Sequence, residues 1–238
     1  MSFFALLVAL LIESTWQWPW ASRLTASFHR YADRLARDLN AGRVSHGVAG
    51  WLAAVCPWVL LSLGLYYLLD YLNGGLGWLW TLVVLSLCLG FRPIARRLRE
   101  TFDALRAGDI DRARAALAAW AGVSEAATYT ESEIAKAAIE TALVRMHRQV
   151  FGVIFWFVLL PGPAGALLYR LSEEIERRWA HRGGEEFRAF GAFAATAFHV
   201  LDWIPVRLSG IGFAIAGNFE DAISTWRTQA RSWLDRTQ

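Results

Sequence analysis

The residues with the clearest chemical potential lie in one apolar stretch, residues 198–217. This stretch reads FHVLDWIPVRLSGIGFAIAG and holds His199, Asp202 and Arg207 around Pro205. A charge at membrane depth is costly and marks a functional site by default. Proline removes a backbone donor, and such a break is tolerated in the bilayer only where protein or a water-filled cavity satisfies the freed groups. The sequence therefore predicts a broken helix and a buried polar site.

Two interpretations of this site stay open. His199 and Asp202 stand three residues apart, on one helical face. Asp202 could orient His199, or it could neutralise Arg207 across the proline. In the first interpretation Arg207 binds an anion or phosphate. In the second, an ion pair between Asp202 and Arg207 only fixes the broken helix.

Two further groups of polar residues flank apolar runs. The run PGPAGALLYR ends at Tyr169 and Arg170, where an arginine can snorkel and small residues let helices pack closely. We place Tyr169 and Arg170 in the candidate ligand site, with tight packing as the alternative. Ahead of the same run, Glu140 is followed by Arg145, His147 and Arg148. Such a basic cluster attracts anionic lipid heads, and Glu140 is added to the candidate ligand-binding residues.

Known catalytic and metal motifs are absent from the sequence. No Walker loop, GxSxG elbow, HExxH or dinucleotide fingerprint occurs. Cys56 and Cys88 each lie in an apolar run without a Cys or His at ligand spacing, so both are interpreted as small hydrophobic residues. No metal, cofactor or catalytic residue is assigned.

The composition is that of a membrane protein. The chain is 55% hydrophobic with 13 Trp and 14 Phe, and its mean hydropathy is +0.30. The arginines sit in loops beside apolar segments, where membrane topology explains them better than nucleic acid does. We therefore expect contacts with membrane lipids and none with nucleic acid.

Apolar runs and polar stretches divide the all-α chain into three predicted regions. Residues 1–92 hold an N-terminal anchor and a hairpin of two spans, 48–69 and 76–91, joined by the turn DYLNGG. This turn lacks Lys and Arg while both flanks are basic, which predicts an external turn. Residues 93–149 read as an inserted cytoplasmic helical subdomain, with a cap at Asp109 and a capping box at Thr130. Residues 150–238 read as broken or re-entrant helices with an amphipathic tail.

Two stretches, PGPAGALLYRL and HVLDWIPVRLSGIGFAIAG, resemble the AmpE family of inner-membrane proteins. That family is encoded beside the amidase AmpD and is named for β-lactamase induction and peptidoglycan recycling. It is in turn similar to the CobD/CbiB membrane proteins, which attach an aminopropanol group to cobyric acid. The resemblance covers most of the chain from Phe91 onward.

Departures from the CobD/CbiB pattern favour the AmpE assignment. In those proteins the segment that matches Glu140 to Trp156 has the form E-x-x-A-E-N-x-x-D-G. Here Val144 and Arg145 stand at its E-N pair, and Arg148 stands at its Asp. Their paired Asp falls on Phe198 and His199, and their next Asn on Asp202. The resemblance thus implies the fold without the cobinamide-forming site.

The expected function is that of an AmpE-like regulator in the bacterial inner membrane, partnered by an AmpD-type amidase. The ligand site is expected to take an anionic cell-wall fragment or a nucleotide. Two alternatives stay open: an enzyme of CobD/CbiB type, or one acting on a cell-wall fragment or lipid-linked sugar. Tyr169, Arg170, His199, Asp202 and Arg207 are expected to converge on one pocket.

Overall fold

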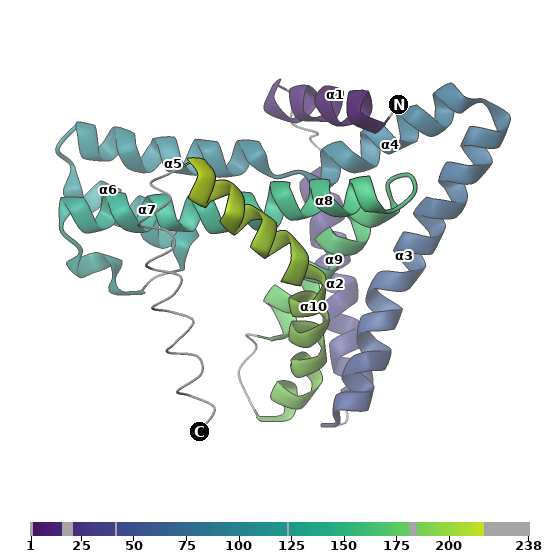
Figure 1. Ribbon diagram of the computed structural model, residues 1–238. Coiled ribbons are helices and arrows are strands. Elements are labelled where there is room, and N and C mark those ends of the chain that lie inside the picture. The colour runs from purple at the N-terminus through teal and green to yellow at the C-terminus, as the bar shows by residue number, and fades with distance from the viewer. Residues whose placement is uncertain (1, 16–20, 41, 123, 181–184, 217–238) are drawn as a thin grey trace.

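The computed structural model describes residues 2–15, 21–40, 42–122, 124–180 and 185–216. Every element in this part of the chain is helical, which confirms the predicted all-α class (Figure 1). The predicted tail helix at 218–238 and the anchoring tryptophans at 16, 18 and 20 lie outside the described residues. The helices are α1 (Ser2–Thr15), α2 (Ala21–Leu39), α3 (Val44–Leu72), α4 (Gly74–Cys88), α5 (Phe91–Arg106), α6 (Ile110–Ala121), the 3₁₀ helix η1 (Ser124–Thr128), α7 (Glu131–Met146), the π-helical turn η2 (His147–Phe151), α8 (Gly152–Leu159), α9 (Ala164–Trp179) and α10 (Glu185–Ala216).

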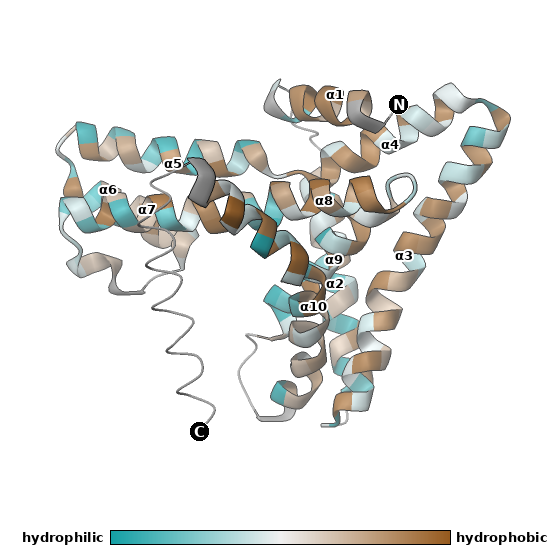
Figure 2. Cartoon of the chain, in the orientation of Figure 1, coloured by the Kyte–Doolittle hydropathy of each residue, from teal (hydrophilic) through white to brown (hydrophobic). Residues whose placement is uncertain are grey.

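Within the described residues, four helical stretches are long and apolar enough to cross a bilayer, so the chain is a multi-pass membrane protein. They are Val44–Leu72, Gly74–Arg106, Glu131–Leu159 and Phe187–Phe213. In α3 only 17% of the apolar window is buried inside the protein, and Figure 2 shows apolar residues along much of its length. Lipid is the solvent that such a surface requires. The α3–α4 turn is set by Asn73, whose side chain accepts a hydrogen bond from the Gly75 amide at 2.8 Å.

The helices α5, α6 and α7 form a layer that extends away from α3 (Figure 1). They share an apolar core that includes Leu105, Leu117 and Ile134. Both predicted N-caps are confirmed. Asp109 accepts from the Arg112 amide at 3.0 Å, and the Thr130 amide donates to Glu133 at 2.7 Å. The cytoplasmic location of this layer stays a prediction. The predicted boundary between the second and third regions, at residue 149, lies inside the continuous helical stretch Glu131–Leu159.

The predicted break at Pro161-Gly162-Pro163 is confirmed. Helix α8 ends at Leu159 and α9 begins at Ala164. Gly162 has a φ of 57°, a left-handed conformation that glycine adopts without a steric penalty. The chain thereby turns back, and α9 packs against α8. A Cβ on Gly165 would lie 1.9 Å from the Trp156 carbonyl oxygen, so the two backbones approach as closely as glycine permits.

The predicted break at Pro205 is wrong, because α10 continues through it from Glu185 to Ala216. Figure 1 shows that this helix changes direction part-way along its length. Proline at 205 cannot donate to the carbonyl of Leu201, four residues earlier. That carbonyl accepts from the indole Nε1 of Trp156 at 3.0 Å instead. Pro57 in α3 shows the same arrangement, since the Ala53 carbonyl accepts from the Tyr31 hydroxyl at 2.8 Å. Hydrogen bonds from neighbouring helices therefore replace the missing ones.

Helix α9 lies at the centre of the fold and contributes to two apolar clusters. One cluster joins Tyr169 to Leu85 of α4 and Phe198 of α10. The other joins Ile175 and Trp179 of α9 to α2, α3 and the Phe190 end of α10. The polar residues of α9 are thus held between helices that pack on several sides.

Candidate functional site

A polar network centred on Asp202 links three segments of the chain. Oδ1 of Asp202 lies 2.8 Å from Nε2 of His147 and accepts from the Tyr169 hydroxyl at 2.7 Å. The other ring nitrogen of His147, Nδ1, lies 2.9 Å from Oγ of Ser209. His147 begins the π-helical turn η2, Tyr169 comes from α9, and the other two residues come from α10. Turns of π-helix inside α-helices are frequent at functional sites.

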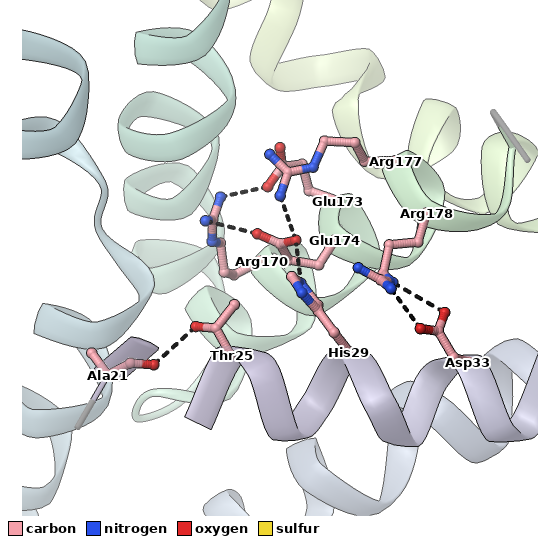
Figure 3. A network of polar contacts seen from close by, with 9 residues as sticks. All are labelled: Ala21, Thr25, His29, Asp33, Arg170, Glu173, Glu174, Arg177 and Arg178. Carbon is pink, nitrogen blue, oxygen red and sulfur yellow. Dashed lines mark hydrogen bonds and ion pairs between the residues drawn. The ribbon is translucent and has the colours of Figure 1, made fainter. Parts of the chain in front are cut away.

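A second network gathers charges on α9 and α2 (Figure 3). Arg170 contacts Glu173 at 2.5 Å and Glu174 at 2.9 Å. Glu174 is also bonded to Arg177 at 2.6 Å and to Nε2 of His29 at 3.0 Å. The residues of α9 in this network are three or four positions apart and share one face of the helix, so this face carries charges of both signs. Asp33 of α2 pairs separately with Arg178 at 2.6 Å.

Burial and charge act differently on the two glutamates. Burial alone would raise the pKa of Glu174, but the hydrogen bond from His29 and the charges of Arg170 and Arg177 lower this pKa to about 2. Burial raises the pKa of Glu173, against the opposing effect of Arg170. The two neighbouring carboxyl groups of this network therefore have pKa values shifted in opposite directions.

A cleft of about 350 Å³ opens between α7, η2 and α9. Three guanidinium groups line it, those of Arg145, Arg148 and Arg177, together with the carboxylates of Glu140 and Glu173. The wall also includes Ala121, Thr141, Val144 and Gln149. Side chains from α7, η2 and α9 therefore meet in a cleft where cations outnumber anions.

Each arginine of this cleft has a fixed position. Arg148 contacts Glu176 at 3.4 Å and lies over the Phe198 ring, 5.0 Å from its centroid. Arg145 donates to the carbonyl oxygen of Trp120. Such partners hold the guanidinium groups in place before any ligand binds, which lowers the entropic cost of binding.

The structure brings only some of the predicted site residues together. Tyr169 bonds to Asp202, whereas Arg170 turns to the carboxylates of α9. His199 is exposed on α10. Arg207 is also exposed and stacks on Trp203, 3.8 Å from the ring centroid, while donating to the Trp203 carbonyl. The expected contacts of Asp202 with His199 and Arg207 are thus replaced by His147 and Tyr169.

Glu140 lies at the cleft but is exposed, and its nearest cation is Lys136 at 3.9 Å. Among the described residues no group of three or more His, Cys, Asp or Glu side chains could hold a metal ion. The cleft therefore presents the guanidinium groups of its arginines beside two carboxylates.

Sequence reasoning missed Ser209, His29 and the glutamates of α9. The spacing of Arg170, Glu173, Glu174 and Arg177 would have indicated the charge network. The arginines of this segment by themselves indicate only membrane topology. His147 was interpreted as part of a lipid-binding cluster, and the sequence holds no local signal for its contact with Asp202, 55 positions away.

Comparison with known proteins shows the family. The family described as CobD/Cbib protein matches residues 3–235. A cobalamin biosynthesis protein CobD from Stutzerimonas stutzeri is 35% identical over 97% of this chain and 75% of its own length. A CobD from Chromobacterium violaceum is 32% identical over 63% of this chain and 47% of its own length. A cobalamin biosynthesis protein CbiB from Salmonella typhi is 25% identical over 95% of this chain and 70% of its own length. No solved structure matches. The chain belongs to the CobD/CbiB family.

The AmpE assignment is therefore wrong. Both the matching family and the relatives above are of CobD/CbiB type, and nothing points to AmpE. The expected link to β-lactamase induction, peptidoglycan recycling and an AmpD-type amidase rested on that assignment and falls with it.

Proposed function

We propose that this chain is an inner-membrane protein of cobalamin biosynthesis that binds an anionic corrinoid intermediate in the arginine-lined cleft. The family of this chain and the names of its relatives support a role in cobalamin biosynthesis. The observation that carries the proposal is the convergence of Arg145, Arg148 and Arg177 on one cleft. Guanidinium groups bind carboxylates and phosphates through paired, charge-assisted hydrogen bonds.

The position of the cleft supports the same function. Val144, Arg145 and Arg148 all line it, and these are the positions where the CobD/CbiB pattern has acidic and amide groups. The substitutions therefore change the sign of charge in this part of the wall. We infer that the guanidinium groups of the cleft hold the anionic arm of a corrinoid.

The experiment measures corrinoid binding to the full chain purified in detergent. Cobyric acid, which is coloured and carries a free carboxylate, is the probe, and bound corrinoid is read by absorbance after equilibrium dialysis. We expect saturable binding that Arg148→Gln weakens by about 10- to 150-fold, as expected for loss of a charged hydrogen bond worth about 1.5–3 kcal/mol. Arg99→Gln, an exposed arginine on α5, is the matched control and should bind like the parent.

Two results would contradict the proposal: no saturable binding by the parent, or equal affinity in Arg148→Gln and the parent. A growth test then addresses the reaction itself. The absent acidic pattern predicts that this chain does not restore cobalamin-dependent growth to a strain lacking its CobD/CbiB protein. Restored growth would show that carboxylates at 144 and 148 and an amide at 145 are dispensable for attachment of aminopropanol.

A further inference from the structure

Ser209, His147 and Asp202 are arranged as a nucleophile, a base and an orienting carboxylate. Oγ of Ser209 is 2.9 Å from one ring nitrogen of His147, and Asp202 is 2.8 Å from the other. A hydroxyl within reach of a histidine that a third group orients is the general signature of an activated nucleophile. We propose that Ser209 is a nucleophile that accepts an acyl group from an oxygen ester or an acyl phosphate.

The hydrogen bonds around Asp202 fix the direction of proton transfer. Its Oδ1 accepts from the Tyr169 hydroxyl and is the acceptor on the Nε2 side of His147. The neutral imidazole then carries its hydrogen on Nε2 and presents the Nδ1 lone pair to Ser209. The Ser209 hydroxyl donates to that lone pair, as a serine must before it gives up its proton.

Packing holds the three side chains in this register. Asp202 and Ser209 lie two helical turns apart on α10, which places them on one face. The His147 ring reaches both of them, and its side chain is only 8% exposed. Tyr169, which holds Asp202 from the other side, packs against Phe198 with ring centroids 5.3 Å apart. The orientation of the histidine is therefore set by buried groups.

Ser209 itself is open to a substrate. It is half-buried, whereas His147 is buried. Two glycines that follow it on α10, Gly210 and Gly212, have open space where a Cβ would stand. The Ser209 hydroxyl is therefore less enclosed than the base, and neither neighbouring glycine adds a side chain that would cover it.

The proposed transfer has two half-reactions, the first with the acyl donor and the second with water or an amine. Oγ of Ser209 bonds to the acyl carbon, and the bond from that carbon to the ester or phosphate oxygen breaks. The serine proton passes to Nδ1 of His147 and from there to the departing oxygen. Water or an amine then attacks the acyl carbon, and the bond from that carbon to Oγ of Ser209 breaks. The proton of the attacking group passes to Nδ1 of His147 and from there to Oγ, which restores the serine.

A fluorophosphonate tests this proposal, because it traps activated serines. Oγ bonds to phosphorus, fluoride leaves, and His147 takes the proton. We expect labelling of the full chain in detergent, mapped to Ser209 by mass spectrometry and absent in Ser209→Ala. Removing the base by His147→Gln should slow labelling by about 10²- to 10⁴-fold. Thr196→Ala, a hydroxyl on the same helix that bonds its own helix backbone, is the control and should label like the parent.

A cysteine variant separates activation from folding. In Ser209→Cys, the His147–Asp202 pair should produce a thiolate that is visible in the ultraviolet and alkylated faster than in Ser209→Cys/His147→Gln. Adding Asp202→Asn should reduce both signals, since Asp202 acts as a positioning residue. Equal alkylation in all three variants, or no fluorophosphonate adduct on Ser209, would overturn the proposal. Neither measurement uses a corrinoid, so failure of the binding experiment leaves this inference intact.

Discussion

The indole of Trp156 donates to the carbonyl of Leu201 at 3.0 Å, and this is the carbonyl that Pro205 leaves without its helical donor. A backbone group without a partner costs several kcal/mol in the hydrocarbon of a bilayer. The indole therefore allows α10 to bend at the proline while remaining one helix. The bend in turn sets the position of Asp202 relative to His147 and Tyr169.

Replacement of Trp156 by phenylalanine should lower thermal stability in detergent by about 1–3 kcal/mol, because the Leu201 carbonyl loses its partner. In the Pro205→Ala background the alanine amide can donate to that carbonyl, so the same replacement should cost much less. A double-mutant cycle measures this coupling. Additive losses would mean that the indole acts only through packing.

The contact between Gly165 and Trp156 predicts a second outcome. Alanine at 165 would bring its Cβ against the backbone carbonyl of Trp156, which cannot move aside without separating α8 from α9. We expect Gly165→Ala to cost about 1–3 kcal/mol of stability, as overpacking does. Gly64→Ala on α3, where no atom stands within 4 Å of a new Cβ, is the matched control. Similar melting of the two variants would refute the close approach.

Glu174 should make stability depend on acid pH. Its pKa of about 2 lies below the ordinary value of 4.5, so its stabilising effect is complete above about pH 4.5 and is lost as the pH falls toward 2. Glu174→Gln should therefore melt earlier than the parent at neutral pH, and the difference should shrink on acidification. The difference of about 2.5 pH units corresponds to at most about 3 kcal/mol.

The control for this titration is Glu100→Gln. Glu100 pairs with Arg96 on the exposed face of α5, where an ion pair contributes little. Its melting curve should follow that of the parent at every pH. A constant difference between Glu174→Gln and the parent from neutral to acid pH would show that Glu174 is not the titrating group.

Local chemistry in the sequence predicted the features that depend on neighbouring residues. The caps at Asp109 and Thr130 and the break at residues 161–163 depend on residues a few positions apart, and all three are confirmed. The continuity of α10 could not be predicted, because the partner of the Leu201 carbonyl lies 45 positions away. The same reason explains why His147 was not linked to Asp202.

Long-range pairing also explains the errors at the site. Sequence spacing placed His199 beside Asp202, but on α10 the first is exposed and the second faces α9. The sequence left open whether Arg207 pairs with Asp202 or binds an anion, and in the structure Arg207 lies on Trp203 at the surface of α10. In contrast, the ion pairs within α9 follow helical spacing, so they could have been predicted from the sequence.

The membrane topology remains a prediction that labelling can test. The turn around Asn73 has no Lys or Arg, whereas the layer that follows exposes Arg96, Arg97 and Arg99 on α5. Positively charged flanks stay in the cytoplasm, so the turn should be external and the α5–α7 layer cytoplasmic. In a background with Cys56 and Cys88 replaced by alanine, Asn73→Cys should react with an impermeant maleimide in intact cells. Ile110→Cys on α6 should react only after permeabilisation. Its reaction in permeabilised cells is the control that this cysteine is accessible to the maleimide. Labelling of position 110 but not of position 73 in intact cells would reverse the topology and place the arginine-lined cleft on the other side of the membrane.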